Sequence, residues 1–235
     1  MNPLSGVLGE AWKMYRAHAA HLLTIAFVIF LIAAIIAGVL ALIGGIFGLL
    51  LGSIIRDIAV FLVEAALVKA VMDIRDGRAD LSLGETISAA GPVLWPVIGA
   101  SILSGIAITI GLILIIVPGL FLITIWAVIV PVIVIERAGV FDSFGRSQRL
   151  VKGYGWPVFG TLVLLFIILI VVELILGIIF VALPALLGSL LATLVAGTLI
   201  APYIALVVTL MYYRLVAAHG GGPVTEGPGA TPGVA

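Results

Sequence analysis

The longest stretches without a charged side chain are the feature that most limits how this chain can fold. No Lys, Arg, Asp or Glu occurs from Ala17 to Ile55 or from Thr86 to Ile135, and Glu173 is the only one from Gly153 to Tyr213. A membrane-spanning helix needs about 20 predominantly apolar residues. Each stretch is too long for one crossing, so the sequence predicts three transmembrane hairpins.

The composition agrees with a chain that lipid solvates over much of its surface. Hydrophobic residues make up 64% of the 235 residues, charged residues only 9%, and the mean hydropathy is +1.43. Soluble domains are about 45–50% apolar and about 25% charged. Basic and acidic residues balance at 11 each, so no net charge attracts nucleic acid, and the absence of cysteine excludes disulfides and thiolate sites.

Glycine and proline mark the predicted turns, because glycine loosens the backbone and proline lacks an N–H group. The predicted turns are the glycines between Gly44 and Gly52, then Pro118-Gly119, then Pro184 with Gly188. We therefore predict an all-α, polytopic membrane protein with one domain over residues 1–218 and a disordered Gly/Pro-rich tail over 219–235. The six predicted spans are approximately 20–43, 53–74, 93–117, 119–136, 156–181 and 188–214.

Basic residues predict the orientation, since they concentrate on the cytoplasmic side of membrane proteins. Only Arg56 falls near the opposite side, so both termini are expected in the cytoplasm, with the chain in the cell membrane. The basic residues on the predicted cytoplasmic side are Lys13, Arg16, Arg75, Arg78, Arg137, Arg146, Arg149, Lys152 and Arg214.

A short amphipathic segment precedes each predicted hairpin on the cytoplasmic side. These segments begin near Asn2, near the capping-box pattern of residues 82–85, and near Phe141. In addition, Trp95-Pro96-Val97 and Trp156-Pro157-Val158 open the third and fifth spans at equivalent places. The pattern predicts a threefold internal repeat of an interfacial helix followed by a hairpin.

The interfacial helices have two interpretations. They anchor the fold in the headgroup layer, or Arg146, Arg149 and Lys152 bind anionic headgroups or a cytosolic partner. Glu136 ends the fourth span beside these residues, where Arg137, Arg146 or Arg149 can reach it. We interpret Glu136 as a structural lock that holds the third interfacial helix.

An ordered set of residues resembles a known membrane family. The chain is similar to the glycerophosphoryl diester phosphodiesterase membrane domain and to the related YciC-like six-helix membrane proteins, over approximately residues 1–218. The resemblance implies a six-helix membrane fold. Some members carry this region fused to a soluble phosphodiesterase barrel, which this sequence lacks, so the activity is not carried over. The matching residues are Asp73–Gly77, Ile116–Gly119, Trp126, Pro131, Ile135-Glu136, Gly139, Arg146-Ser147 and Leu150–Gly153.

Carboxylates inside predicted spans are candidate sites, because a charge at a helix centre costs about 2.5–3.5 kcal/mol. Glu64 lies near the middle of the second span, Asp57 lies seven residues earlier on the same face, and Glu173 lies in the fifth span. One interpretation makes them a proton- or cation-binding cluster. In the other, Glu64 is protonated or hydrogen-bonded to another helix and Glu173 lies near the outer interface.

No pattern in the sequence predicts an enzyme. The zinc-protease, serine-hydrolase, P-loop and dinucleotide patterns are absent. His18 and His21 lack a nearby carboxylate, so they make a poor zinc site. We expect no catalytic residues, no metal and no cofactor.

The leading expectation is a non-enzymatic integral membrane protein that organises lipid or a membrane-protein partner. Its partners are then membrane lipids and a membrane or cytosolic protein, with no nucleic acid. The alternative is a small transporter or channel that uses Glu64 and Asp57 for proton or cation coupling. An intramembrane enzyme ranks third.

Overall fold

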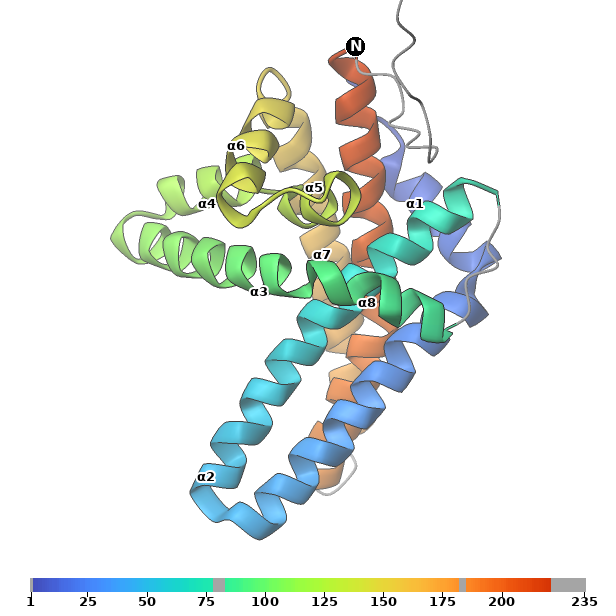
Figure 1. Cartoon of the computed structure of the whole chain (residues 1–235), viewed down its shortest axis with the longest axis vertical. Coiled ribbons are helices and arrows are strands. Elements are labelled where there is room, and N and C mark those ends of the chain that lie inside the picture. Colours follow the sequence, from blue (N-terminus) through green and yellow to red (C-terminus); the bar gives the residue numbers. More distant parts are fainter. Residues whose placement is uncertain (1, 78–82, 182–184, 221–235) are drawn as a thin grey trace, which may run out of the picture.

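The computed structural model describes residues 2–77, 83–181 and 185–220. The described residues form eight helices and no strand, which confirms the predicted all-α class (Figure 1). The capping-box residue Ser82, the turn residue Pro184 and tail residues 221–235 lie outside these ranges. The helices are α1 (Val7–Ala17), α2 (Ala19–Arg75), α3 (Leu83–Leu114), α4 (Ile116–Ile125), α5 (Ile129–Glu136), α6 (Val140–Val151), α7 (Gly155–Phe180) and α8 (Ala185–Ala218).

Five helical segments among the described residues are long and apolar enough to cross a membrane, which confirms that the protein is membrane-embedded. They do not correspond one to one with the six predicted spans. The first two predicted spans both fall within α2, whereas α7 begins and ends within one residue of the fifth. The five segments are Ala19–Arg75, Gly84–Leu114, Ile116–Glu136, Gly155–Phe180 and Leu194–Ala218.

Helix α2 folds back on itself at Gly45. This glycine has φ 52° and ψ −132°, a conformation that is essentially restricted to glycine. Just after the bend, a Cβ atom on Gly48 would overlap the carbonyl oxygen of Leu40, and one on Gly52 would lie 3.1 Å from that of Ala37. The two halves of α2 therefore touch, and the bend forms the lower tip of the molecule in Figure 1.

Helix α3 continues through Pro92 and Pro96, so the predicted second interfacial helix is not a separate element, and that prediction is wrong. Burial on one face of α3, including Val93 and Val97, stabilises a helix that the prolines alone would interrupt. The Trp95-Pro96 pair thus lies inside a helix, whereas Trp156-Pro157 lies in the first turn of α7. The predicted repeat is not supported at this point.

The turn between α3 and α4 lies at Ile115, which is extended with φ −155° and ψ 132°. Pro118 and Gly119, where the sequence predicts the turn, lie in the first turn of α4 instead. Gly111 and Gly119 let the two helices approach, because a Cβ on Gly111 would lie 3.1 Å from the Cα of Gly119. In Figure 1 this α3–α4 hairpin is roughly horizontal, whereas α7 and α8 are roughly vertical.

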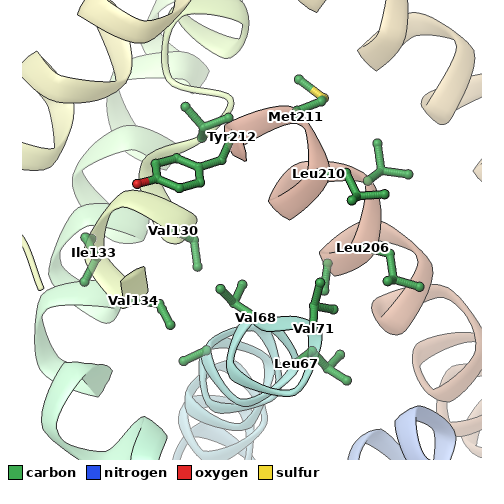
Figure 2. Packing of buried hydrophobic residues seen from close by; sticks show 14 of the residues in the cluster. Leu67, Val68, Val71, Val130, Ile133, Val134, Leu206, Leu210, Met211 and Tyr212 are labelled. Carbon is green, nitrogen blue, oxygen red and sulfur yellow. The ribbon is translucent and has the colours of Figure 1, made fainter. Parts of the chain in front are cut away.

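Runs of buried side chains on α2, α5 and α8 meet in a region called here the three-helix junction. Figure 2 shows Val68 and Val71 of the second half of α2 among side chains from α5 and α8. Tyr212 is fully buried beside them. The junction belongs to the end of the molecule that also holds α1, α6 and the last turns of α8, called here the polar end (upper part of Figure 1).

Candidate functional site

The fourth predicted span is broken between α4 and α5. Trp126–Val128 leave the helix, and Pro131 accounts for the break, since a proline disfavours helix at the residues before it. The buried Ser147 of α6 bridges the break. Its hydroxyl donates a hydrogen bond to the carbonyl of Ile125 (2.9 Å) and accepts one from the N–H of Val128 (3.4 Å).

Glu136, at the end of α5, contacts both α6 and α8. The Nε atom of Arg146 lies 2.9 Å from each carboxylate oxygen of Glu136. The Tyr212 hydroxyl donates to Oε1 of the same carboxylate at 2.8 Å. The side chains of Arg146 and Glu136 are only 33% and 20% exposed. Arg146 thus faces inward onto one of its expected partners, and it leaves the surface where the sequence predicts headgroup contacts.

The side of α6 opposite its buried residues Ser143 and Ser147, together with the residues just after the helix, carries exposed basic and aromatic side chains. Arg149 and Lys152 are exposed, and Nη1 of Arg149 lies along the helix at Gly145, 3.3 Å from where a Cβ would stand. Phe141 is 81% exposed on α6 and Trp156 is 84% exposed just beyond it. The group Phe141, Gln148, Arg149, Lys152 and Trp156 is called here the α6 surface.

Arg214 ties the chain's first residues to the end of α8. Its Nη1 atom donates to the carbonyls of Pro3 (3.2 Å) and Ser5 (2.5 Å), and its Nη2 atom pairs with Glu10. The sequence predicts only that Arg214 lies on the cytoplasmic side of the membrane. No local pattern links it to residues more than 200 positions earlier.

Aromatic side chains strengthen the same α1–α8 contact. The Tyr15 hydroxyl donates to the carbonyl of Leu199 (3.1 Å), and the Tyr203 hydroxyl donates to that of Leu8 (3.2 Å). Trp12 stacks on Tyr15 with ring centroids 5.6 Å apart. Burial raises the pKa of the Tyr15 phenol above its ordinary value. Helix α1 is therefore fixed to the bundle.

The three candidate carboxylates do not gather into one cluster. Asp57 and Glu64 lie on α2, whereas Glu173 is exposed on α7, which packs mainly on α8, α4 and α1. Among the described residues no three His, Asp or Glu side chains are grouped so that they could hold a metal ion. The predicted three-member cluster is therefore corrected to separate groups, because α2 and α7 present these residues to different surroundings.

Glu64 differs from the other two carboxylates in its surroundings. It is half-buried, whereas Asp57 and Glu173 are exposed. Within residues 2–77, 83–181 and 185–220 it makes no hydrogen bond or ion pair. The alternative expectation, a hydrogen bond from Glu64 to another helix, is not met there.

Comparison with known proteins leaves the family prediction untested. The resemblance to the glycerophosphoryl diester phosphodiesterase membrane domain rests on the residues quoted in the sequence, several of which make the contacts described above: Glu136 with Arg146, and Ser147 at the α4–α5 break. No protein-family model, no curated protein and no solved structure matches this chain.

Proposed function

We propose that this is a non-enzymatic integral membrane protein that organises lipid or a membrane-protein partner around the α6 surface. One observation carries the proposal. Phe141 and Arg149 are exposed on α6, and Lys152 and Trp156 are exposed just after it, while the other face of α6 is fixed to the bundle.

The chemistry of the α6 surface suits the headgroup layer of a membrane. Aromatic rings favour the membrane–water interface, and each basic side chain near an anionic leaflet contributes about 1 kcal/mol of attraction. The inward contacts of Arg146 and Ser147 hold α6 in place before anything binds. A partner therefore meets a preformed surface, which lowers the entropy cost of binding.

The proposal includes six crossings with both termini in the cytoplasm of a cell-membrane protein. Helix α2 has 57 residues, about 85 Å at a rise of about 1.5 Å per residue, which is too long for one crossing of a hydrocarbon core about 30 Å thick. Its bend at Gly45 supports two crossings by α2. Helices α7 and α8 run side by side and supply two more crossings. The α3–α4 hairpin runs across their direction in Figure 1, so the remaining two crossings, by α3 and by α4 with α5, are proposed from the length and apolar composition of these segments.

Cysteine labelling in intact cells tests this topology, because the native chain contains no cysteine. Asp142→Cys is expected to react only after the cytoplasm is opened. Phe47→Cys, at the α2 bend, and Ala185→Cys, at the start of α8, are expected to react from outside. Labelling of position 142 from outside, or protection of position 47, would reject the proposed arrangement.

Native mass spectrometry of the protein released gently from its own membrane tests the organising role. The unaltered chain is expected to retain an anionic phospholipid or a stoichiometric protein. The double variant Arg149→Glu, Lys152→Glu is expected to lose most of it. Arg56→Glu, an exposed arginine on α2, is the matched control and is expected to retain it. Equal retention by the double variant and the control contradicts the proposal.

A second candidate function is a small transporter or channel that uses Glu64 and Asp57. The half-buried Glu64 without a partner among the described residues favours it. In proteoliposomes, Glu64→Gln is expected to abolish cation-driven or proton-driven flux while the protein stays folded. Unchanged flux in that variant removes this candidate.

A further inference from the structure

The position of Glu64 on α2 aims its side chain into the three-helix junction. In Figure 2, Val68 lies on the side of α2 that faces Val130 and Val134 of α5, and Val71 lies on the side that faces Leu206 and Leu210 of α8. Successive helical residues are rotated by about 100°. Glu64 therefore lies about 40° from Val68 on one side and about 20° from Val71 on the other. It points between α5 and α8, one turn further from the polar end than Val68.

One face of α8 carries two buried hydroxyl groups that lack a hydrogen-bond partner among the described residues. Thr198, Pro202 and Thr209 lie four and seven residues apart, which places them on one side of the helix. Thr198 is only 9% exposed and Thr209 is fully buried. The hydroxyl of each has no hydrogen-bond partner within the part of the chain that the structure describes.

A ring contact sets the register between the two helices. The guanidinium carbon of Arg75 lies 3.5 Å from the centre of the Tyr213 ring. Glu64 comes 11 residues before Arg75, and Pro202 comes 11 residues before Tyr213. Both helices run toward the polar end at this point (Figure 1). Eleven residues make about three full turns, so Glu64 and Pro202 lie the same number of turns below this contact on their two helices.

Pro202 adds a third oxygen atom to this level. Proline has no N–H group, so the carbonyl four residues earlier, that of Thr198, loses its helical donor. This register implies that the Glu64 carboxylate lies near the hydroxyl and the freed carbonyl of Thr198. Unsatisfied polar groups cost several kcal/mol each in hydrocarbon surroundings, so a bound species that all three oxygens can contact is favoured.

We infer that Glu64 and Thr198 form a binding site for a monovalent cation, Na⁺, within the three-helix junction. Carboxylate, hydroxyl and carbonyl oxygens are ligands for hard cations. One carboxylate balances one positive charge, whereas a divalent ion would leave an uncompensated charge in the bundle. Helix interruptions that expose carbonyls are a recognised way to bind Na⁺ inside membranes. The site is independent of the α6 surface, and it is the binding step that the transport alternative requires.

Thermal unfolding of the full-length protein in detergent tests the site with Na⁺ as the only probe. Tryptophan fluorescence reports unfolding while Na⁺ replaces choline at constant ionic strength. At a Na⁺ concentration about 100 times the dissociation constant, the Tm is expected to rise by about 5 °C or more. Equal Tm values in Na⁺ and choline overturn the inference, since a protonated Glu64 or a water molecule would then satisfy these groups instead.

Matched variants locate the effect. Glu64→Gln keeps the shape of the side chain and is expected to abolish the Na⁺ shift, whereas Glu173→Gln, an exposed carboxylate on α7, is expected to keep it. Thr198→Val is expected to raise the half-saturating Na⁺ concentration about tenfold, as expected for loss of one ligand worth about 1.4 kcal/mol. Thr198→Val therefore still tests the Na⁺ site if Glu64→Gln does not fold.

Three outcomes contradict the site: an unchanged Na⁺ shift in Glu64→Gln, an unchanged half-saturating concentration in Thr198→Val, or a shift lost equally in Glu173→Gln. Flux is a separate measurement. Na⁺ binding without flux keeps the site and removes the transport alternative, while the lipid-retention experiment on the α6 surface is unaffected by either result.

Discussion

The two ends of the molecule are stabilised in different ways. At the polar end, side chains from different helices are joined by hydrogen bonds and ion pairs, as in the contacts of Glu136 with Arg146 and Tyr212. At the α2 bend the two halves of one helix touch through glycines. The largest side chains around the bend are exposed and apolar: Leu42, Ile43, Ile46 and Phe47.

This difference shows where the fold is specified. In lipid, burying an apolar side chain against another helix gains little, so close backbone approach through small residues decides which helices associate. At the membrane surface, water competes for polar groups, and a contact forms only where geometry favours it. The polar end therefore depends on side-chain identity, and the bend depends on side-chain size.

Removal of the Glu136 carboxylate is expected to have the largest effect. Glu136→Ala leaves the Arg146 guanidinium and the Tyr212 hydroxyl of the polar end without their shared acceptor. Because both ion-pair side chains are largely buried, we expect a loss of about 2–4 kcal/mol. The fall in Tm is then about 5–10 °C in detergent.

The control for this prediction lies on α6, the helix of the partner residue Arg146. Arg149→Ala removes an exposed arginine three residues after Arg146 and is expected to change the Tm by less than about 2 °C. In a double-mutant cycle, Glu136→Ala and Arg146→Ala are expected to be strongly non-additive. Additive losses would show that the pair does not hold α6 in place.

A larger residue at the bend is expected to have the next largest effect. In Gly48→Ala the new methyl group overlaps the carbonyl of Leu40, so the halves of α2 must separate, at a cost of about 1–3 kcal/mol. Gly38→Ala is the control, because a Cβ atom there meets nothing within 4 Å. A pair of engineered cysteines across the bend is expected to cross-link more slowly in Gly48→Ala. Equal cross-linking rates in both variants would contradict the close contact.

The bridge across the α4–α5 break is expected to contribute less. Ser147→Ala removes the acceptor of the Val128 N–H and the donor to Ile125, with an expected loss of about 1–2 kcal/mol. Ser143→Ala is matched to it, since the Ser143 hydroxyl donates to the carbonyl of Val140 within its own helix. Amide hydrogen exchange at Val128 is expected to accelerate in the first variant alone. The same acceleration in both would remove the bridging role.

The sequence predicts best those elements that depend on composition and local turns. The all-α class follows from the long charge-free stretches, and α7 matches its predicted span because Trp156-Pro157 marks its first turn. Continuity of α3 through Pro92 and Pro96 is not predictable in the same way. It depends on the burial of one face against other helices, which no local pattern records.

The contacts of the candidate site also fall into those that the sequence predicts and those that depend on helix packing. Glu136 and Arg146 are ten residues apart in neighbouring elements, so their contact is among those the sequence anticipates. Tyr212 reaches the same carboxylate from 76 residues away, and such pairs arise only from the packing of α8. The direction of Arg146 is also set by packing, which is why it leaves the α6 surface while Arg149 stays on it.

The smallest expected effect concerns the contact of α1 with α8 at the polar end. Tyr15→Phe removes one hydrogen bond, to the carbonyl of Leu199, and keeps the stacking on Trp12, so the loss near neutral pH is about 0.5–1 kcal/mol. Burial raises the pKa of Tyr15, so the folded protein holds this proton more tightly than the unfolded chain. Stability then falls as the pH rises beyond about 10. The variant is expected to show a shallower fall in thermal unfolding measured from pH 9 to 11, and an unchanged slope would show that the phenol is not buried against α8.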